Sequence, residues 1–140
     1  MPSEHSLSHI VFIGRTYQVE WYYKEDGSMP GYEFYLGLRE IDKARFMVLV
    51  EHLAEASRGT FLPKTHYNIE DAEHGIYAFK IHAQRFLNFM TQGKKFIVTN
   101  GFYKQSQKLR RKEREEVHKA IRCKKEYEMR VKRGDYYEAR

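Results

Sequence analysis

The sequence has a single cysteine and no apolar run long enough to cross a membrane. One cysteine excludes an internal disulfide, and Lys124 and Lys125 beside Cys123 predict an exposed or half-exposed thiol without a base next to it. No stretch of about 18 apolar residues occurs, and the N-terminal segment lacks the basic start and apolar core of a secretory signal. We therefore expect a cytoplasmic protein that does not span a membrane.

Motifs for metals and for nucleotide cofactors are also missing. The seven histidines are scattered, and neither a CxxC nor an HExxH pattern occurs. There is no glycine-rich loop of the kind that cradles phosphates. We therefore expect neither a metal nor a cofactor.

What the chain does have is enough apolar material for one core. It has 140 residues, of which 41% are hydrophobic and 15% aromatic, while 31% are charged. This length suits a single domain, and the composition argues against a disordered chain. We expect one domain over residues 1–140, with residues 1–16 as an N-terminal extension and 132–140 as a flexible tail.

Positive charge is concentrated in the last third of the chain. Residues 1–90 contain nine Lys and Arg against twelve Asp and Glu, whereas residues 91–140 contain sixteen against seven. A basic surface on an acidic body suits a phosphate-rich partner, because each cation that meets a phosphate releases counterions. A basic surface that aids solubility or binds an acidic protein is the alternative.

The first half of the chain predicts two strands followed by two helices. Residues 10–13 and 17–23 are β-branched and aromatic, with Gly14 as a break, and residues 24–31 form a turn. A short helix is expected over 30–39. A second is expected to be capped by Asp42 and stopped by Gly59, and the two should form an antiparallel hairpin.

The second half predicts an antiparallel meander and a basic helix. Residues 61–75 have no period and are expected to be a loop. Strands are expected over 75–83, 85–91 and 95–103, joined by tight connections. An amphipathic helix with a narrow apolar stripe should follow from 107 to 131. The expected fold class is thus α+β.

This order of elements resembles the RelE/ParE toxin superfamily, in its HigB-like, phage-derived branch. The resemblance covers about residues 17–130. It depends on the DG turn at 26–27, LAEASRG at 53–59, GIYAFKI at 75–81, QRFLNF at 84–89 and GFYKQSQK at 101–108. The chain departs from the family's pattern at Lys80, at Gln105, and at Leu109 and Arg110, where a Thr-Pro pair is usual.

The resemblance implies a small RelE-like domain that acts as the toxin of a type II toxin-antitoxin pair. Its partners would be a cognate helix-turn-helix antitoxin, messenger RNA and the ribosomal A site, where relatives cut the message without a metal. The alternative is a non-catalytic binding toxin or regulator, such as a ParE-like gyrase inhibitor or a degenerate copy.

Metal-free RNA cleavage needs a proton acceptor for the 2′-hydroxyl, a proton donor for the leaving oxygen, and cations for the phosphorane. For the endoribonuclease that the resemblance implies, the predicted catalytic residues are Arg85, Lys104, Lys80 and His82, of which Arg85 and Lys104 match basic positions of the family. Period-two alternation directs Tyr77, Phe79 and Ile81 to the helix-covered core, and Ile76, Ala78, Lys80 and His82 to the other face. Arg85 is the strongest candidate, because a guanidinium can grip a phosphate in two places. Its alternative is a salt bridge across the sheet to a glutamate such as Glu73.

RNA binding is predicted for four further residues. Phe102 and Tyr103 alternate, so Phe102 should be core, while Tyr103 could stack on a base or donate a proton. Lys108, Arg110 and Arg111 would position RNA through its phosphates, unless they form only a solvated helix face. The tyrosine-rich tail is either a partner-binding segment or a free terminus, and the sequence does not decide between the two.

Overall fold

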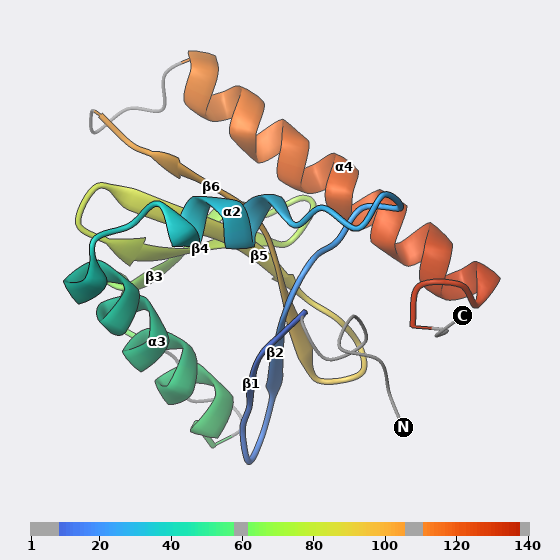
Figure 1. The fold of residues 1–140 in the computed structure, drawn as a ribbon, viewed down its shortest axis with the longest axis horizontal. Coiled ribbons are helices and arrows are strands. Elements are labelled where there is room, and N and C mark those ends of the chain that lie inside the picture. The colour runs from blue at the N-terminus through green and yellow to red at the C-terminus, as the bar shows by residue number, and fades with distance from the viewer. Residues whose placement is uncertain (1–8, 58–61, 106–110, 138–140) are drawn as a thin grey trace.

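The computed structural model describes residues 9–57, 62–105 and 111–137. These residues form an open six-stranded sheet with helices on both faces (Figure 1). The elements in chain order are β1 (Ile10–Ile13), β2 (Gln18–Trp21), α2 (Pro30–Leu36), α3 (Glu40–Glu55), β3 (Tyr67–Asp71), β4 (Ile76–Ile81), β5 (Gln84–Met90), β6 (Lys95–Tyr103) and α4 (Arg111–Arg133). The predicted α+β class is confirmed. No helix among the described residues is long and apolar enough to cross a membrane.

The strands are ordered β1-β2-β6-β5-β4-β3 across the sheet. Strands β4, β5 and β6 pair antiparallel in sequence order, so the predicted meander is confirmed. The N-terminal hairpin of β1 and β2 joins this meander through a parallel pairing of β2 with β6. The longest strand, β6, therefore lies at the centre of the sheet.

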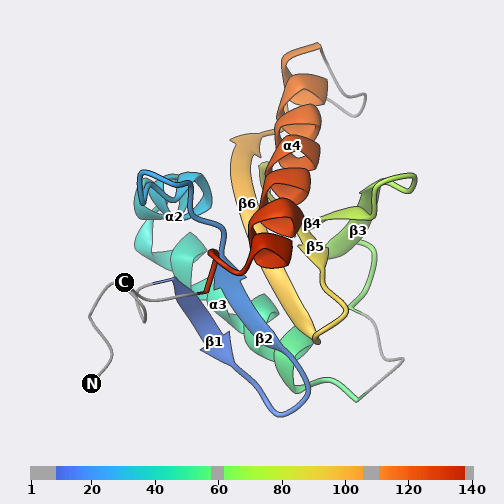
Figure 2. The same cartoon turned by 90° about the vertical axis from the view of Figure 1, so that its right-hand side faces the viewer.

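Helices lie on opposite faces of the sheet, as Figures 1 and 2 show, and a hydrophobic core lies under the helices of each face. On one face, α2 and α3 cover a core that includes Trp21, Phe46 and Phe86. On the other, α4 covers a core that includes Leu87 and Ile121. Because both faces are buried, the inner strands are apolar over most of their length instead of alternating with polar residues.

The alternation predicted for β4 is confirmed on one face and corrected on the other. Phe79 and Ile81 point into the core under α2 and α3, with Tyr77 at its margin. Ile76 and Ala78, expected on an open face, are fully buried under α4. The amphipathic helix covers this end of the strand, so only the far end of β4 remains open.

The two helices after β2 do not form the expected hairpin. Helix α2 lies over β6 and α3 runs in a different direction, past β4 and the N-terminal strands (Figure 1). Asp42 is not the cap either, because α3 begins at Glu40 with Arg39 as its N-cap residue. Asp42 instead turns inward from the first turn and is buried. Gly59, the expected stop, lies outside the described residues.

Part of the segment expected to be a loop forms the strand β3. It pairs antiparallel with β4, with Tyr67 opposite Phe79 and Asn68 opposite Ala78. Tyr67 stacks on Tyr77 with ring centroids 5.3 Å apart. The strand is short and irregular at the sheet edge, and cross-strand packing on β4 stabilises it more than its own pattern does.

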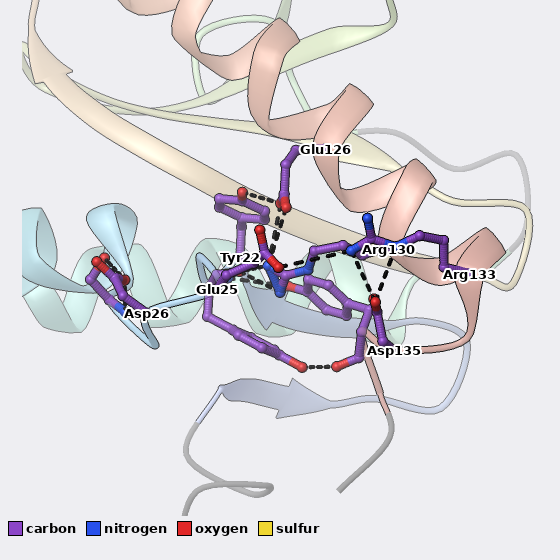
Figure 3. A network of polar contacts seen from close by, with 10 residues as sticks. Tyr22, Glu25, Asp26, Glu126, Arg130, Arg133 and Asp135 are labelled. Carbon is purple, nitrogen blue, oxygen red and sulfur yellow. Dashed lines mark hydrogen bonds and ion pairs between the residues drawn. The ribbon is translucent and has the colours of Figure 1, made fainter. Parts of the chain in front are cut away.

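In the described part of the tail, residues 132–137, the side chain of Tyr136 packs against the extension of β2. Tyr136 is 1% exposed and stacks on Tyr23 at 4.3 Å between ring centroids. The buried Arg130 guanidinium donates two hydrogen bonds of 3.0 Å to the carbonyl of Tyr23, and it pairs with Glu126 (Figure 3). Ring stacking and buried charge pairing thus fasten the end of α4 to the strand β2 and its extension.

Candidate active site

Lys80 and Arg85 are cross-strand partners at the open end of β4 and β5. The half-buried Arg85 guanidinium donates through Nη1 to the carbonyls of His82 at 2.6 Å and Gln84 at 3.1 Å. These bonds hold the guanidinium against the β4–β5 turn. Among the described residues, its buried Nε has no hydrogen-bond partner. A buried donor left unpaired costs free energy.

Lys104 reaches the same place from the end of β6. Its backbone N–H donates to the carbonyl of Ala83 at 2.7 Å, which places the residue beside the β4–β5 turn. Burial lowers the pKa of Lys80, and the charges of Arg85 and Lys104 lower it further. Three of the four predicted catalytic residues are therefore within electrostatic reach of one another.

Glu70 of β3 is the acid of this cluster. Burial raises the pKa of its carboxyl group, although the charges of Lys104, Arg85 and Lys80 act in the opposite direction. Burial likewise lowers the pKa of Arg85, against the charges of Glu70 and Glu113. The glutamate expected as the structural alternative, Glu73, pairs with His74 at 3.8 Å. Glu70 was missed because it lies in the segment expected to be a loop.

His82 does not continue the face of Lys80. It lies in the β4–β5 turn with a φ of 55°, a left-handed conformation that ends the alternation of the strand. Its imidazole turns toward α3, where Nε2 contacts Nη1 of Arg45 and lies 3.9 Å from Oδ1 of Asp42. The predicted common face of Lys80 and His82 is therefore wrong.

A groove nevertheless brings His82, Lys80 and Arg85 together. It lies between α3 and the ends of β3 and β4 and has a volume of about 580 Å³. Its lining consists of Ile41, Ala44, Arg45, Val48, Leu49, Thr65, His66, Lys80, Ile81, His82 and Arg85. None of these described lining residues is Asp or Glu. The groove is thus cationic where Lys80 and Arg85 line it. The residues that α3 contributes, here called the α3 wall, are largely apolar: Ile41, Ala44, Arg45, Val48 and Leu49.

Two lining residues with useful chemistry escaped sequence reasoning. Arg45 is one of the outward-facing residues of α3, and His66 precedes β3. The carbonyl of His66 accepts a 2.8 Å bond from the backbone N–H of Lys80, so His66 is next to β4. Only the unforeseen pairing of β3 with β4 brings His66 to the groove, and the isolated sequence has no signal for that.

Asp42 is a buried negative charge on α3 that does not line the groove. Burial acts to raise the pKa of this carboxyl, but the hydrogen bond and charge of Arg39, with the charge of His82, lower it below the usual value. Gln84 also donates to its Oδ2 at 3.3 Å. Its Oδ1, which faces His82, is buried and has no hydrogen-bond partner within the part of the chain that the structure describes. Asp42 is thus ionised and placed to interact with a charged imidazole.

The residues predicted to bind RNA are spread over different places. Tyr103 is half exposed, but its ring lies 5.2 Å from Phe34 of α2, on the face away from α4. Phe102 is buried in the α4 core, as predicted. Arg111 is exposed at the start of α4, where its Nε lies 4.0 Å from Glu115. Lys108 and Arg110 lie outside the described residues.

Cys123 is buried, contrary to the exposed or half-exposed position expected from its lysine neighbours. It lies on the apolar stripe of α4, and burial raises the pKa of its thiol to about 11. A thiol that stays protonated at neutral pH is a poor nucleophile. Cys123 is therefore part of the core and not of the site.

Comparisons with known proteins add no family to this description. No protein-family model matches the chain, and no curated protein matches it. Over residues 9–57, 62–105 and 111–137, no three His, Cys, Asp or Glu side chains gather as a metal site would require.

Proposed function

We propose that the protein is the toxin of a type II toxin-antitoxin pair and that it cleaves messenger RNA in the ribosomal A site. A cognate antitoxin would restrain it. The observation that supports this proposal most is the meeting of Lys80, Arg85 and His82 in one groove, with Lys104 close by. These are the groups that RNA cleavage by the 2′-hydroxyl requires.

In this proposal Arg85 and Lys80 bind the scissile phosphate. Their charges are paired across the strands, and a phosphate between them would relieve the repulsion of two neighbouring cations. As the 2′-oxygen attacks, the phosphorane gains negative charge, which the same two cations stabilise more strongly than the ground state. Lys104 adds to the positive potential from the side of β6.

His82 is the proposed proton acceptor. Arg45 has only donors, so its contact with His82 is a hydrogen bond when Nε2 of His82 is unprotonated, which is the form that a general base needs. The 2′-hydroxyl would take the place of Arg45 and transfer its proton to Nε2. The resulting imidazolium would be stabilised by the ionised Asp42, whose Oδ1 lies 3.9 Å away.

His66 is the proposed proton donor, as the second imidazole of the groove. The bond from phosphorus to the 5′-oxygen breaks as the bond to the 2′-oxygen forms, and the leaving oxygen takes the proton of His66. The products are a 2′,3′-cyclic phosphate and a 5′-hydroxyl. An imidazolium group can act as the general acid in this step.

Induction of the protein in bacteria, with mapping of new 5′ ends in messenger RNA, tests the proposal. We expect new ends within coding regions for the wild type and for an Arg15→Ala control, whose arginine is exposed beside Glu55. The Arg85→Ala variant should produce none. Growth arrest without new ends would contradict the nuclease proposal and favour a non-catalytic binding toxin, and cleavage by Arg85→Ala would refute the site.

A further inference from the structure

The α3 wall of the groove carries exposed apolar side chains that take no part in the proposed cleavage steps. Ile41 and Val48 are 54% and 52% exposed, and Ala44 lies between them in the helix. The three residues are spaced by three and four positions, so they form one stripe on α3. Leu49 and the buried Ile81 extend the apolar surface toward the sheet.

The position of this wall relative to the cations indicates what it binds. Lys80, Arg85 and His82 line the same groove, with Arg45 and His66. A ligand that matches the whole groove therefore has a negatively charged part next to a flat or apolar part. The groove's volume of about 580 Å³ is in the range that suits ligands of nucleotide size.

We propose that the α3 wall is a base-binding subsite, in which one nucleotide of the RNA places its base against Ile41, Ala44 and Val48 while its phosphate meets Lys80 and Arg85. This inference rests on the proposed function and adds to it the place where the substrate's base binds. Single-stranded RNA is recognised through unstacked bases that pack on side chains, which fits a wall beside a phosphate site. The absence of Asp and Glu among the described lining residues agrees with a polyanionic ligand.

The base would also meet the planar side chains of Arg45 and His82, which line the same groove. Arg45 comes from α3 and His82 from the β4–β5 turn, and their side chains are in contact with each other. A guanidinium or an imidazole can stack on any base, and Thr65 can hydrogen-bond to one. Stacking of this kind gives modest sequence preference and depends mainly on the presence of a base.

The test uses RNA trinucleotides of adenine, cytosine or uracil in which the 2′-hydroxyls are replaced by hydrogen, so that cleavage is impossible. Binding to the full chain is followed by NMR of the methyl groups of isoleucine, valine and alanine. We expect the signals of Ile41, Ala44 and Val48 to shift, while those of Ile13, an exposed residue that does not line the groove, do not. Trinucleotides lacking the middle base should bind about tenfold more weakly.

A Val48→Trp substitution fills the groove from an exposed helix position, so the fold should tolerate it. It should weaken binding of the complete trinucleotide about tenfold and leave the abasic trinucleotide unaffected. An Ile13→Trp variant is the control. The Arg85→Ala substitution should weaken the binding of both the complete and the abasic trinucleotide, because it removes the proposed phosphate contact.

The outcomes separate the subsite from the proposed function. The subsite is wrong if the Ile41, Ala44 and Val48 signals do not move at millimolar trinucleotide, or if the Val48→Trp and wild-type proteins bind equally. It is also wrong if a synthetic amphipathic Glu/Leu helical peptide shifts those signals where RNA does not. If the binding test fails but the wild-type protein still produces new 5′ ends in messenger RNA, only the subsite is refuted. If the wild-type protein produces no new 5′ ends, the nuclease proposal itself is refuted.

Discussion

Lys80 of β4 and Arg85 of β5 are directly opposite each other in the antiparallel ladder, so two cations share one position of the sheet. Like charges at such positions destabilise a sheet, and the partial burial of both side chains adds to this cost, as their lowered pKa values indicate. The carboxyl of Glu70 acts against the repulsion, but its effect on the pKa of Lys80 is smaller than that of Arg85. An anion bound between Lys80 and Arg85 would offset their repulsion, which would explain why both residues are cations.

The first prediction is that the Lys80→Met variant is more stable than the wild type and inactive. Removing one of the paired charges should raise the free energy of unfolding by a few tenths to about 1 kcal/mol. The Lys125→Met variant, at an exposed position of α4, serves as a control and should change stability little. Urea denaturation gives both values, and a less stable Lys80→Met variant would show that the pair is not repulsive.

The second prediction concerns the half-buried carboxyl of Glu70. Because burial raises its folded-state pKa above the usual 4.5, ionising Glu70 costs the folded state more than the unfolded state. Below the unfolded pKa both states are protonated and the group has no effect. As pH rises through the folded pKa, wild-type stability should fall relative to the Glu70→Gln variant.

Denaturation midpoints from pH 4 to pH 8 measure this difference. The Glu70→Gln variant should be the more stable protein at neutral pH, and its advantage should shrink toward pH 4. The Glu73→Gln variant is the control, since the Glu73 side chain is 85% exposed. A constant difference between Glu70→Gln and wild type across this range would contradict the raised pKa.

The third prediction tests the buried hydrogen bond between Tyr67 and Asn88. The Tyr67 hydroxyl donates to Oδ1 of Asn88 at 2.6 Å, and the Asn88 amide donates to the carbonyls of Tyr77 and Phe86. A Tyr67→Phe substitution leaves Oδ1 buried without a donor and should lower the free energy of unfolding by about 1–3 kcal/mol. The Tyr77→Phe variant, in the same ring stack, should change it by less than about 0.5 kcal/mol. Equal effects of the two substitutions would mean that the hydrogen bond contributes nothing specific.

The fourth prediction concerns the close approach of α2 to β6. A Cβ on Gly101 would lie 2.3 Å from Cδ2 of Phe34, a distance that requires the ring or the helix to move. The Gly101→Ala variant should therefore be less stable by about 1–3 kcal/mol, with altered NMR signals in α2. The Gly93→Ala control places its Cβ 3.7 Å from Thr91 and should be neutral or stabilising. An undisturbed Gly101→Ala protein would show that α2 is not packed on β6 as described.

The sequence predicted the elements whose pattern is local and missed those that depend on distant partners. The strands β1, β2, β4, β5 and β6 each have β-branched and aromatic residues between clear breaks, and they occur where expected. Strand β3 was missed because its stability comes from pairing with β4. The docked tail was missed for a similar reason, since Tyr136 packs on residues more than 110 positions earlier.

The candidate site shows the same division. Arg85, Lys80 and Lys104 come together because strand register follows from the meander, which alternation and short turns predict. The orientation of His82 could not be predicted, because it depends on one left-handed residue in a turn. Arg45 and His66 enter the groove from α3 and β3, whose positions depend on tertiary packing.

The central claim is that the Lys80 and Arg85 pair supports cleavage of RNA by its own 2′-hydroxyl. The most direct measurement is the end chemistry of messenger RNA after incubation of the purified protein with programmed ribosomes. We predict fragments that end in a 2′,3′-cyclic phosphate and a 5′-hydroxyl. The Arg85→Ala variant should cleave at least about a hundredfold more slowly, which is the size of effect expected when a contact that stabilises the transition state is lost. Intact message with the wild type, or equal cleavage by wild type and Arg85→Ala, would contradict the account.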